Sequence, residues 1–193
     1  TAPGVRLLAK LEGQNPAGSV KDRIARAMIA DAEADGTLTP GRTIIEPSSG
    51  NTGIALAMIA RIRGYPIKIV LPENVSIERR QALEVFGAEI IDSPGAEGSN
   101  GAVSLARRLA DENPEWVFLY QYANEANPRA HYTTTGPEII RDLPEVTHFV
   151  AGLGTGGTLM GTGRRLKEFN PVIEVIAAAP EPDDQIQGLR SLE

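Results

Sequence analysis

Short β-branched runs alternate with amphipathic stretches along the whole chain. The runs predict strands over Val5–Leu11, Thr43–Glu46, Ile67–Leu71, Glu89–Asp92, Val117–Tyr120, His148–Ala151 and Val172–Ala177. Apolar residues at helical spacing predict helices over Val20–Asp35, Thr52–Arg63, Ile77–Phe86, Ala102–Glu112, Arg129–Arg141 (broken near Pro137) and Thr158–Phe169. The polar stretch Ser93–Asn100 predicts a surface loop. This order predicts an α/β fold, a mostly parallel twisted sheet flanked by helices.

Ligands of such sheets bind beyond the carboxyl ends of the strands. We therefore expect chemistry in the loops that leave Leu11, Glu46, Tyr120 and Ala151. The cysteine and histidine content excludes several kinds of chemistry in these loops. The 193 residues include no cysteine, which excludes disulfide scaffolds, thiolate nucleophiles and cysteine-ligated metals. The two histidines lack the spacing of a zinc motif, so no metal site is predicted.

Charge and hydropathy exclude two further classes of partner. The net charge is −6 and the basic residues are scattered, which disfavours nucleic acid. The longest apolar run, Ile54–Ala60, is far shorter than the roughly 20 residues that span a bilayer. The first residues also lack the basic and apolar segments of a secretory signal. We expect a cytoplasmic protein that acts on small molecules, without membrane contact.

The first loop, Asn15–Arg23 (NPAGSVKDR), leads from a predicted strand into a helix. Ser19 is the expected N-cap, and Asp22 would complete a capping box. This arrangement places Lys21 in the first turn, where the helix dipole and burial lower the pKa of its amine. A lysine is usually solvated at the surface, but a neutral amine at a strand end suits Schiff-base chemistry.

The second loop, Glu46–Gly53 (EPSSGNTG), gathers three hydroxyls, a carboxamide and free backbone N–H groups at a helix N-terminus. Because the loop has no basic residue, we expect it to bind a small carboxylate or an aromatic oxygen. Simple capping of the helix by Ser49 or Asn51 is the alternative.

The last loop, Gly152–Thr158 (GLGTGGT), matches GxGxxG between a strand and a helix. Its two threonine hydroxyls and backbone N–H groups suit a single phosphate ester. A dinucleotide site, with Glu181 on a ribose hydroxyl, is the rival interpretation. Together the three loops provide an amine, a carboxylate site and a monophosphate site. Pyridoxal phosphate uses all three, whereas a nicotinamide cofactor uses only the last.

These motifs, in this order and spacing, resemble those of the fold-type II pyridoxal-phosphate enzymes of the cysteine synthase and cystathionine β-synthase family. Ala130–Ile139 and Gln185–Arg190 resemble the cysteine synthase B branch. The resemblance implies two open, twisted, mostly parallel sheets and a homodimer. It also implies a larger domain over 1–18 and 132–193, left incomplete, and a smaller domain over 19–131. The family's opening segment is missing here, as is its C-terminal part with the hydroxyl that meets the pyridine nitrogen.

The resemblance also assigns roles to single residues. Lys21 would carry the cofactor and later act as the base at the substrate Cα, and Asn51 would bind the pyridoxal ring oxygen. The cofactor phosphate would be held by Gly154, Thr155, Gly156, Gly157 and Thr158. The substrate carboxylate would be held by Ser48, Ser49, Gly50, Thr52 and Gln121. Ser48 stands where the family usually has threonine, and Arg190 would meet an anionic group of the substrate.

The reaction implied is replacement at Cβ of an activated serine, O-acetylserine or O-phosphoserine, by a sulfur nucleophile to give L-cysteine. We expect ping-pong kinetics from such covalent catalysis. Three alternatives stay open at this point: replacement like that of cystathionine β-synthase, an NAD-dependent oxidoreductase, and a non-catalytic module. Such a module would hold a peptide's C-terminal carboxylate at 48–52.

Overall fold

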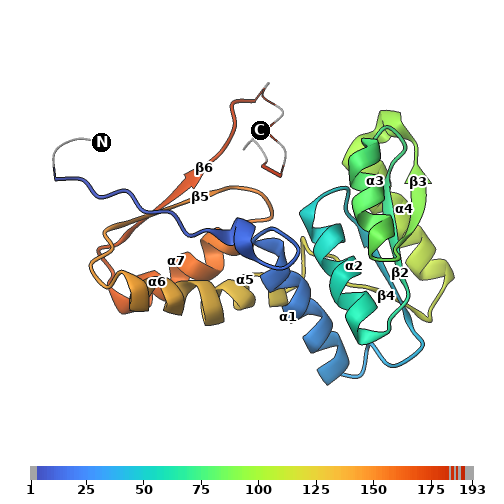
Figure 1. Cartoon of the computed structure of the whole chain (residues 1–193), viewed down its shortest axis with the longest axis horizontal. Coiled ribbons are helices and arrows are strands. Elements are labelled where there is room, and N and C mark those ends of the chain that lie inside the picture. The colour runs from blue at the N-terminus through green and yellow to red at the C-terminus, as the bar shows by residue number, and fades with distance from the viewer. Residues whose placement is uncertain (1–3, 183, 185, 187, 190–193) are drawn as a thin grey trace.

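The computed structural model describes residues 4–182, 184, 186, 188 and 189 (Figure 1). Its strands are β1 Thr43–Pro47, β2 Ile67–Pro72, β3 Glu89–Ser93, β4 Trp116–Phe118, β5 His148–Gly152 and β6 Glu174–Ala178. Its α-helices are α1 Lys21–Ala34, α2 Asn51–Arg63, α3 Ile77–Val85, α4 Gly98–Glu112, α5 Ala126–Ala130, α6 Gly136–Asp142 and α7 Gly157–Phe169. Short 3-10 helices η1 Glu12–Gln14 and η2 Gly95–Glu97 and the π-helical turn η3 His131–Thr135 complete the list.

The strands form two parallel sheets. One has four strands in the order β3-β2-β1-β4, and the other pairs β5 with β6. In Figure 1, α2, α3 and α4 lie with the four-stranded sheet, α5, α6 and α7 lie with the two-stranded sheet, and α1 lies between. The predicted α/β class with two parallel sheets is confirmed. The domain boundaries at 18/19 and 131/132 stay a prediction.

The first sheet is buried on both faces. Ile44 and Ile69 belong to the large apolar cluster that includes residues of α1 and α2. Ile45, one residue along the same strand, packs with Val70 against Ala102 of α4. Because alternate side chains of a strand point to opposite faces, helices must cover both faces of this sheet. Because helices hold this sheet on both faces, the positions of the loops at the carboxyl ends of its strands are fixed.

The strand predicted over Val5–Leu11 is wrong. These residues form no strand in the structure, and Leu7 is 83% exposed. In the described part of the chain no neighbouring strand offers them backbone partners, and a strand cannot persist without such pairing. Side chains hold the segment instead: Arg6 pairs with Glu145 at 2.7 Å, and Lys10 pairs with Glu138 at 2.7 Å.

The polar loop predicted over Ser93–Asn100 is also wrong, since η2 and the first turn of α4 occupy most of it. Gly101 and Ala102 are buried, and this packing extends the helix by one turn toward its N-terminus. The break expected near Pro137 takes the form of the π-turn η3, directly before α6. Proline has no N–H to donate to the preceding turn, which disfavours a regular α-helix there.

Strand β4 is shorter than predicted, because it ends at Phe118 and not at Tyr120. Tyr120 adopts a left-handed conformation with φ of 49°. An extended strand cannot include such a residue, so the chain turns sharply at this point.

Candidate active site

A cavity of about 320 Å³ lies where the loops after β1, β4 and β5 meet the first turn of α1. It is one of two cavities described here. The predicted site residues that line it are Lys21, Ser48, Ser49, Gly50, Asn51, Thr52, Gln121, Gly154 and Thr155. The structure thus brings the three sequence motifs to one space, although the role of each residue stays a prediction. Parallel pairing explains why the loops after β1 and β4 meet, because their carboxyl ends share one edge, whereas the loop after β5 comes from the second sheet and the first turn of α1 follows no strand.

Lys21 is the first residue of α1, as the loop pattern predicts. The Ser19 hydroxyl accepts the Lys21 N–H at 3.1 Å, but the residue in the N-cap position is Val20. Asp22 does not close a capping box with Ser19; its Oδ2 accepts the N–H of Ala17 at 2.6 Å. Asp22 therefore reaches further back along the chain than a capping box requires, and its bond to Ala17 ties the loop to the start of the helix.

The amine of Lys21 faces the cavity without an anionic partner. Burial lowers its pKa below the ordinary value of 10.5. Among the described residues, no oxygen accepts a hydrogen bond from Nζ and no carboxylate forms an ion pair with it. A lower pKa increases the fraction of neutral amine at a given pH, which is the form that attacks a carbonyl carbon.

The loop between β1 and α2 provides hydrogen-bond donors in the cavity that Lys21 also lines. Ser48 is the residue that caps the helix, since its Oγ accepts the N–H of Gly53 at 3.0 Å. Its hydroxyl proton is still available for a ligand. Thr52 Oγ1 donates to Gln121 Oε1 at 2.7 Å, which leaves the Gln121 amide N–H groups as donors. Capping by Ser49 or Asn51, the alternative considered from the sequence, is absent among the described contacts.

The predicted phosphate loop divides into two parts. Gly154 and Thr155 line the main cavity, whereas Gly156 and Gly157 line an adjoining cavity of about 120 Å³. Thr158 lines neither of these cavities, and its Oγ1 lies 3.2 Å from Nε2 of His131. Only part of the predicted set therefore faces the same space as Lys21.

The sequence reasoning assigned no role to two buried polar side chains that contact the site residues, Asn127 and Glu46. Asn127 is buried and donates from Nδ2 to the Thr155 hydroxyl and to the Gln121 carbonyl, each at 2.9 Å. A Cβ on Gly157 would lie 1.8 Å from Asn127 Oδ1, so only glycine fits there. Asn127 lies in a short helix without an apolar period, where a single sequence offers no signal.

The second missed residue is Glu46, the last polar residue of an otherwise apolar strand. It is fully buried, and burial raises the pKa of its carboxyl to about 7. The backbone N–H groups of Gln121 and Tyr120 donate to this carboxyl and oppose that rise. A charged residue directly after Ile44 and Ile45 was the available signal, because carboxylates are rarely fully buried without a partner.

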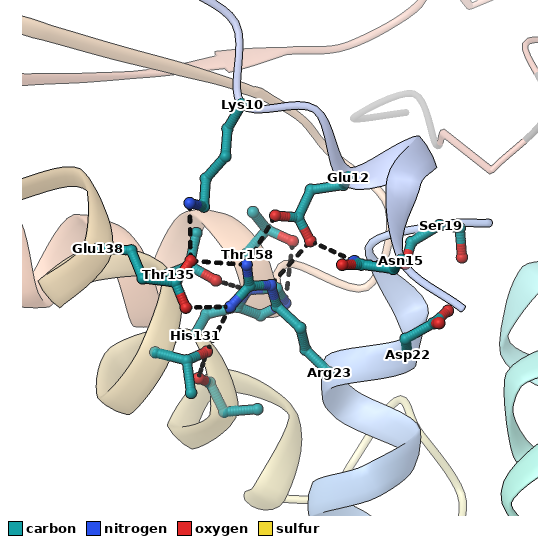
Figure 2. Close-up of polar contacts among 12 residues, drawn as sticks. Lys10, Glu12, Asn15, Ser19, Asp22, Arg23, His131, Thr135, Glu138 and Thr158 are labelled. Carbon is teal, nitrogen blue, oxygen red and sulfur yellow. Dashed lines mark hydrogen bonds and ion pairs between the residues drawn. The ribbon is translucent and has the colours of Figure 1, made fainter. Parts of the chain in front are cut away.

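His131 is a buried histidine with a hydroxyl near each ring nitrogen. Its Nδ1 lies 2.9 Å from Thr135 Oγ1 (Figure 2). Burial lowers the pKa of His131 to about 4, with smaller contributions from the charges of Lys21 and Arg23. The imidazole is therefore neutral at pH 7 and links η3 to the first turn of α7. The described residues contain no group of three potential metal-ligating side chains.

An ion-pair network holds the first turn of α1 against α6 (Figure 2). Arg23 Nε lies 2.7 Å from Glu12 Oε2, and its Nη2 lies 2.7 Å from Glu138 Oε2. Lys10 adds a second cation to Glu138 at 2.7 Å. Paired hydrogen bonds between guanidinium and carboxylate are geometrically specific, so the network orients the turn that carries Lys21.

The network predicts a pH dependence of stability. The Arg23 hydrogen bonds lower the pKa of Glu138 from 4.5 to about 2. A lowered carboxyl pKa stabilises the fold above pH 4.5, and this contribution is lost as the pH falls toward 2. We expect Glu138→Gln to lower the free energy of unfolding by about 1–2 kcal/mol at pH 7, after discounting for partial exposure.

Denaturant unfolding at several pH values measures this effect. The difference between the two proteins should close as the pH approaches 2. Glu145→Gln is the matched control, since Glu145 pairs with Arg6 at an exposed site and its loss should change little. A constant difference at all pH values would contradict the assignment to the Glu138 charge.

Two residues of the sequence interpretation lie away from this site. Arg190, expected to meet an anionic substrate group, lies outside the described residues. Glu181, which the dinucleotide interpretation needs, is exposed and does not line either cavity. The geometry therefore does not favour a dinucleotide at the glycine-rich loop. No helix of the described chain combines the length and apolar character needed to cross a membrane.

Several known proteins are similar to this chain in sequence and in structure. Residues 1–191 match the family model described as "Pyridoxal-phosphate dependent enzyme". The chain is 48% identical over 98% of its length to a cysteine synthase of Aquifex aeolicus, covering 59% of that protein. It is 50% identical over 95% of its length to a cysteine synthase B of Pseudomonas aeruginosa, covering 62% of it.

A solved structure agrees with these relatives. The crystal structure of an O-ureido-L-serine synthase superposes with a TM-score of 0.91 at 42% identity, covering 94% of this chain and 61% of that one. The chain thus spans about 60% of the length of the curated relatives it matches. The resemblance drawn from the three loops is confirmed, as is the cofactor that it implies. The chain belongs to the family of pyridoxal-phosphate dependent enzymes.

Proposed function

We propose that this chain carries the cofactor site of an enzyme that makes L-cysteine by replacement at Cβ of an activated serine. One observation carries the proposal: Lys21, which is partly buried, lines the cavity that the hydroxyl-rich loop and Gly154–Thr155 also line. The names of the curated relatives support cysteine synthesis. Because the chain covers only about 60% of the length of those relatives, the activity is proposed for the whole protein.

The residues present fit pyridoxal phosphate. Lys21 would hold it covalently, Asn51 would bind its ring oxygen, and Thr155 with the neighbouring glycine N–H groups would bind its phosphate. Asn127 supports this arrangement, because its bond to the Thr155 hydroxyl orients that oxygen. When bound, the cofactor supplies a ring that accepts the negative charge developing at the substrate Cα.

The chain's own groups would then bind the substrate and move its proton. The Ser48 hydroxyl and the Gln121 amide would donate to the substrate carboxylate, alongside backbone N–H groups at the start of α2. Lys21 Nζ, released from the cofactor, would take the proton from Cα. A depressed amine pKa favours this step, since the neutral amine is the base.

The proposal extends to the leaving group of the activated serine and to the nucleophile that replaces it. O-acetylserine and O-phosphoserine are both proposed substrates, and Arg190 is proposed to meet the anionic group of the second. A sulfur nucleophile is supported by the cysteine synthases among the relatives. The similarity to an O-ureido-L-serine synthase supports a core that serves other nucleophiles as well, as a cystathionine β-synthase-like reaction would require.

The spectrum of the purified protein tests the proposed function. We expect a visible absorption band that disappears on treatment with borohydride, after which mass mapping places the reduced cofactor on Lys21. A colourless protein that binds a peptide carboxylate would favour the non-catalytic module. Thermal protection by NAD(H), without protection by pyridoxal phosphate, would favour the oxidoreductase.

A homodimer in the cytoplasm is part of the same proposal and is supported by the family resemblance. Sedimentation of the cofactor-loaded protein measures the mass of the assembly. A monomer over a wide range of concentration would contradict the dimer.

A further inference from the structure

Glu46 is a buried charge that the proposed mechanism does not use. Its side chain is fully buried at the end of β1, and no cation pairs with it in the described part of the chain. Both carboxylate oxygens accept backbone hydrogen bonds instead. The N–H of Tyr120 donates to Oε2 at 2.7 Å, and the N–H of Gln121 donates to Oε1 at 3.0 Å.

The two donors belong to a strained corner. Tyr120 is the non-glycine residue with positive φ among the described residues, at 49°. A side chain in this conformation is disfavoured, and it persists where the surroundings hold it. Successive N–H groups around a left-handed residue converge on one point and form a binding site for an anion. The carboxylate of Glu46 occupies this point from inside the protein.

The corner controls where Gln121 lies. The Gln121 side chain accepts from Thr52 of α2 at 2.7 Å. Its backbone carbonyl accepts from Asn127, which also donates to Thr155 of the phosphate loop. Gln121 is buried and lines both cavities. Movement of the corner would therefore displace Gln121, a side chain of the segment after β4 that contacts Thr52 at the start of α2.

We propose that Glu46 is a positioning residue, whose carboxylate holds the Tyr120–Gln121 corner so that the Gln121 amide faces the carboxylate of the amino-acid substrate. The inference rests on the proposed function, because it names the group that orients one of the proposed substrate ligands. Burial raises the pKa of Glu46 to about 7 and so disfavours the carboxylate, whereas the N–H groups of Tyr120 and Gln121 lower the pKa and favour the ionised form that accepts both of them.

A double-mutant cycle tests the inference on the cofactor-loaded full chain. The variants are Glu46→Gln, Gln121→Ala and the double variant, and the probe is L-alanine, which has the substrate carboxylate but no leaving group. Glutamine keeps the shape of Glu46 but turns an NH₂ toward one of the two N–H donors. We expect each single change to weaken L-alanine binding about tenfold, as loss of one buried hydrogen bond does.

The double variant distinguishes positioning from a general structural role. If Glu46 acts through Gln121, the double variant binds L-alanine no more than about threefold more weakly than Gln121→Ala. Effects that multiply to about a hundredfold would overturn the inference, as would unchanged binding by Glu46→Gln. Ile45→Val is the matched control, since this buried neighbour on β1 packs toward α4 and should leave the affinity within twofold.

Amide hydrogen exchange provides a readout that needs no cofactor. In Glu46→Gln, exchange at Tyr120 and Gln121 should accelerate at least tenfold relative to the amides of β1. Unchanged exchange would overturn the inference even where the proposed function holds. If the parent protein takes up neither cofactor nor L-alanine, the proposed function fails and the substrate role of Glu46 fails with it. Glu46→Asp, which keeps the charge, replaces glutamine in the cycle should Glu46→Gln not fold.

Discussion

Replacing Lys21 by alanine is expected to abolish both the visible absorption of the bound cofactor and turnover. The amine is buried at the cavity, and its pKa is lowered by that burial, so it is the nucleophile that the site offers. In the described residues no other lysine lines this cavity, so no neighbour can replace it. Loss of an activated nucleophile that also moves a proton reduces turnover by several orders of magnitude.

The spectrum and a steady-state assay for cysteine formation measure this loss, with the full-length protein where the chain is part of one. Lys167→Ala is the control, because Lys167 lies on α7 and donates to the Pro171 carbonyl at an exposed site. This control should keep both the absorption band and the rate. A purified, folded Lys21→Ala protein that retained both properties would end the assignment of Lys21.

Replacing Gly161 by alanine is expected to lower the free energy of unfolding by about 3 kcal/mol or more. A Cβ at this position would lie 2.0 Å from the Pro128 carbonyl oxygen and 2.9 Å from the His131 Cβ. Backbone atoms cannot rotate away, so α7 would have to move off α5. In an unobstructed helix the same substitution stabilises by roughly 0.5–1 kcal/mol, which makes the sign of the change informative.

The position of α7 matters for the proposed cofactor site, since Thr158 in its first turn meets His131. Denaturant unfolding measures the stability, and titration with pyridoxal phosphate measures the affinity; both should fall in Gly161→Ala. Gly163→Ala serves as the control on the same helix. There the new Cβ would meet a Val175 methyl at 3.0 Å, a side chain that can adjust, so we expect a loss below about 1 kcal/mol. Equal losses in the two variants would contradict the packing described here.

The sequence predicted elements best where burial follows a regular period. The runs that became β1, β2, β3, β5 and β6 were each located within two residues of their observed ends. Val5–Leu11 carries an equally apolar pattern but has no paired strand, because pairing depends on a neighbour and not on the run itself. The start of α4 was missed for a related reason, since packing of Gly101 and Ala102 on the sheet, and not local propensity, places its first turn.

The candidate site likewise contains residues that the sequence predicted and residues that it did not. Lys21, the hydroxyl-rich loop and the glycine-rich loop were predicted from the sequence, because each motif is a continuous segment that leads into a helix. Glu46 was in view but had no role, since its partners lie 74 and 75 residues further along the chain.

The order of the helices, the order of the strands from β1 onward and the composition of the three loops could be predicted from the sequence, because periodicity and loop chemistry are local properties. Three contacts come from packing that the hydrophobic pattern does not record: Ser48 caps α2, Thr158 meets His131, and Glu46 accepts the N–H of Tyr120. The contact of Glu46 depends on the register in which β1 pairs with β4, where Ile45 lies opposite Phe118. A register joins segments that are distant in sequence, and a hydrophobic pattern records only which face is buried.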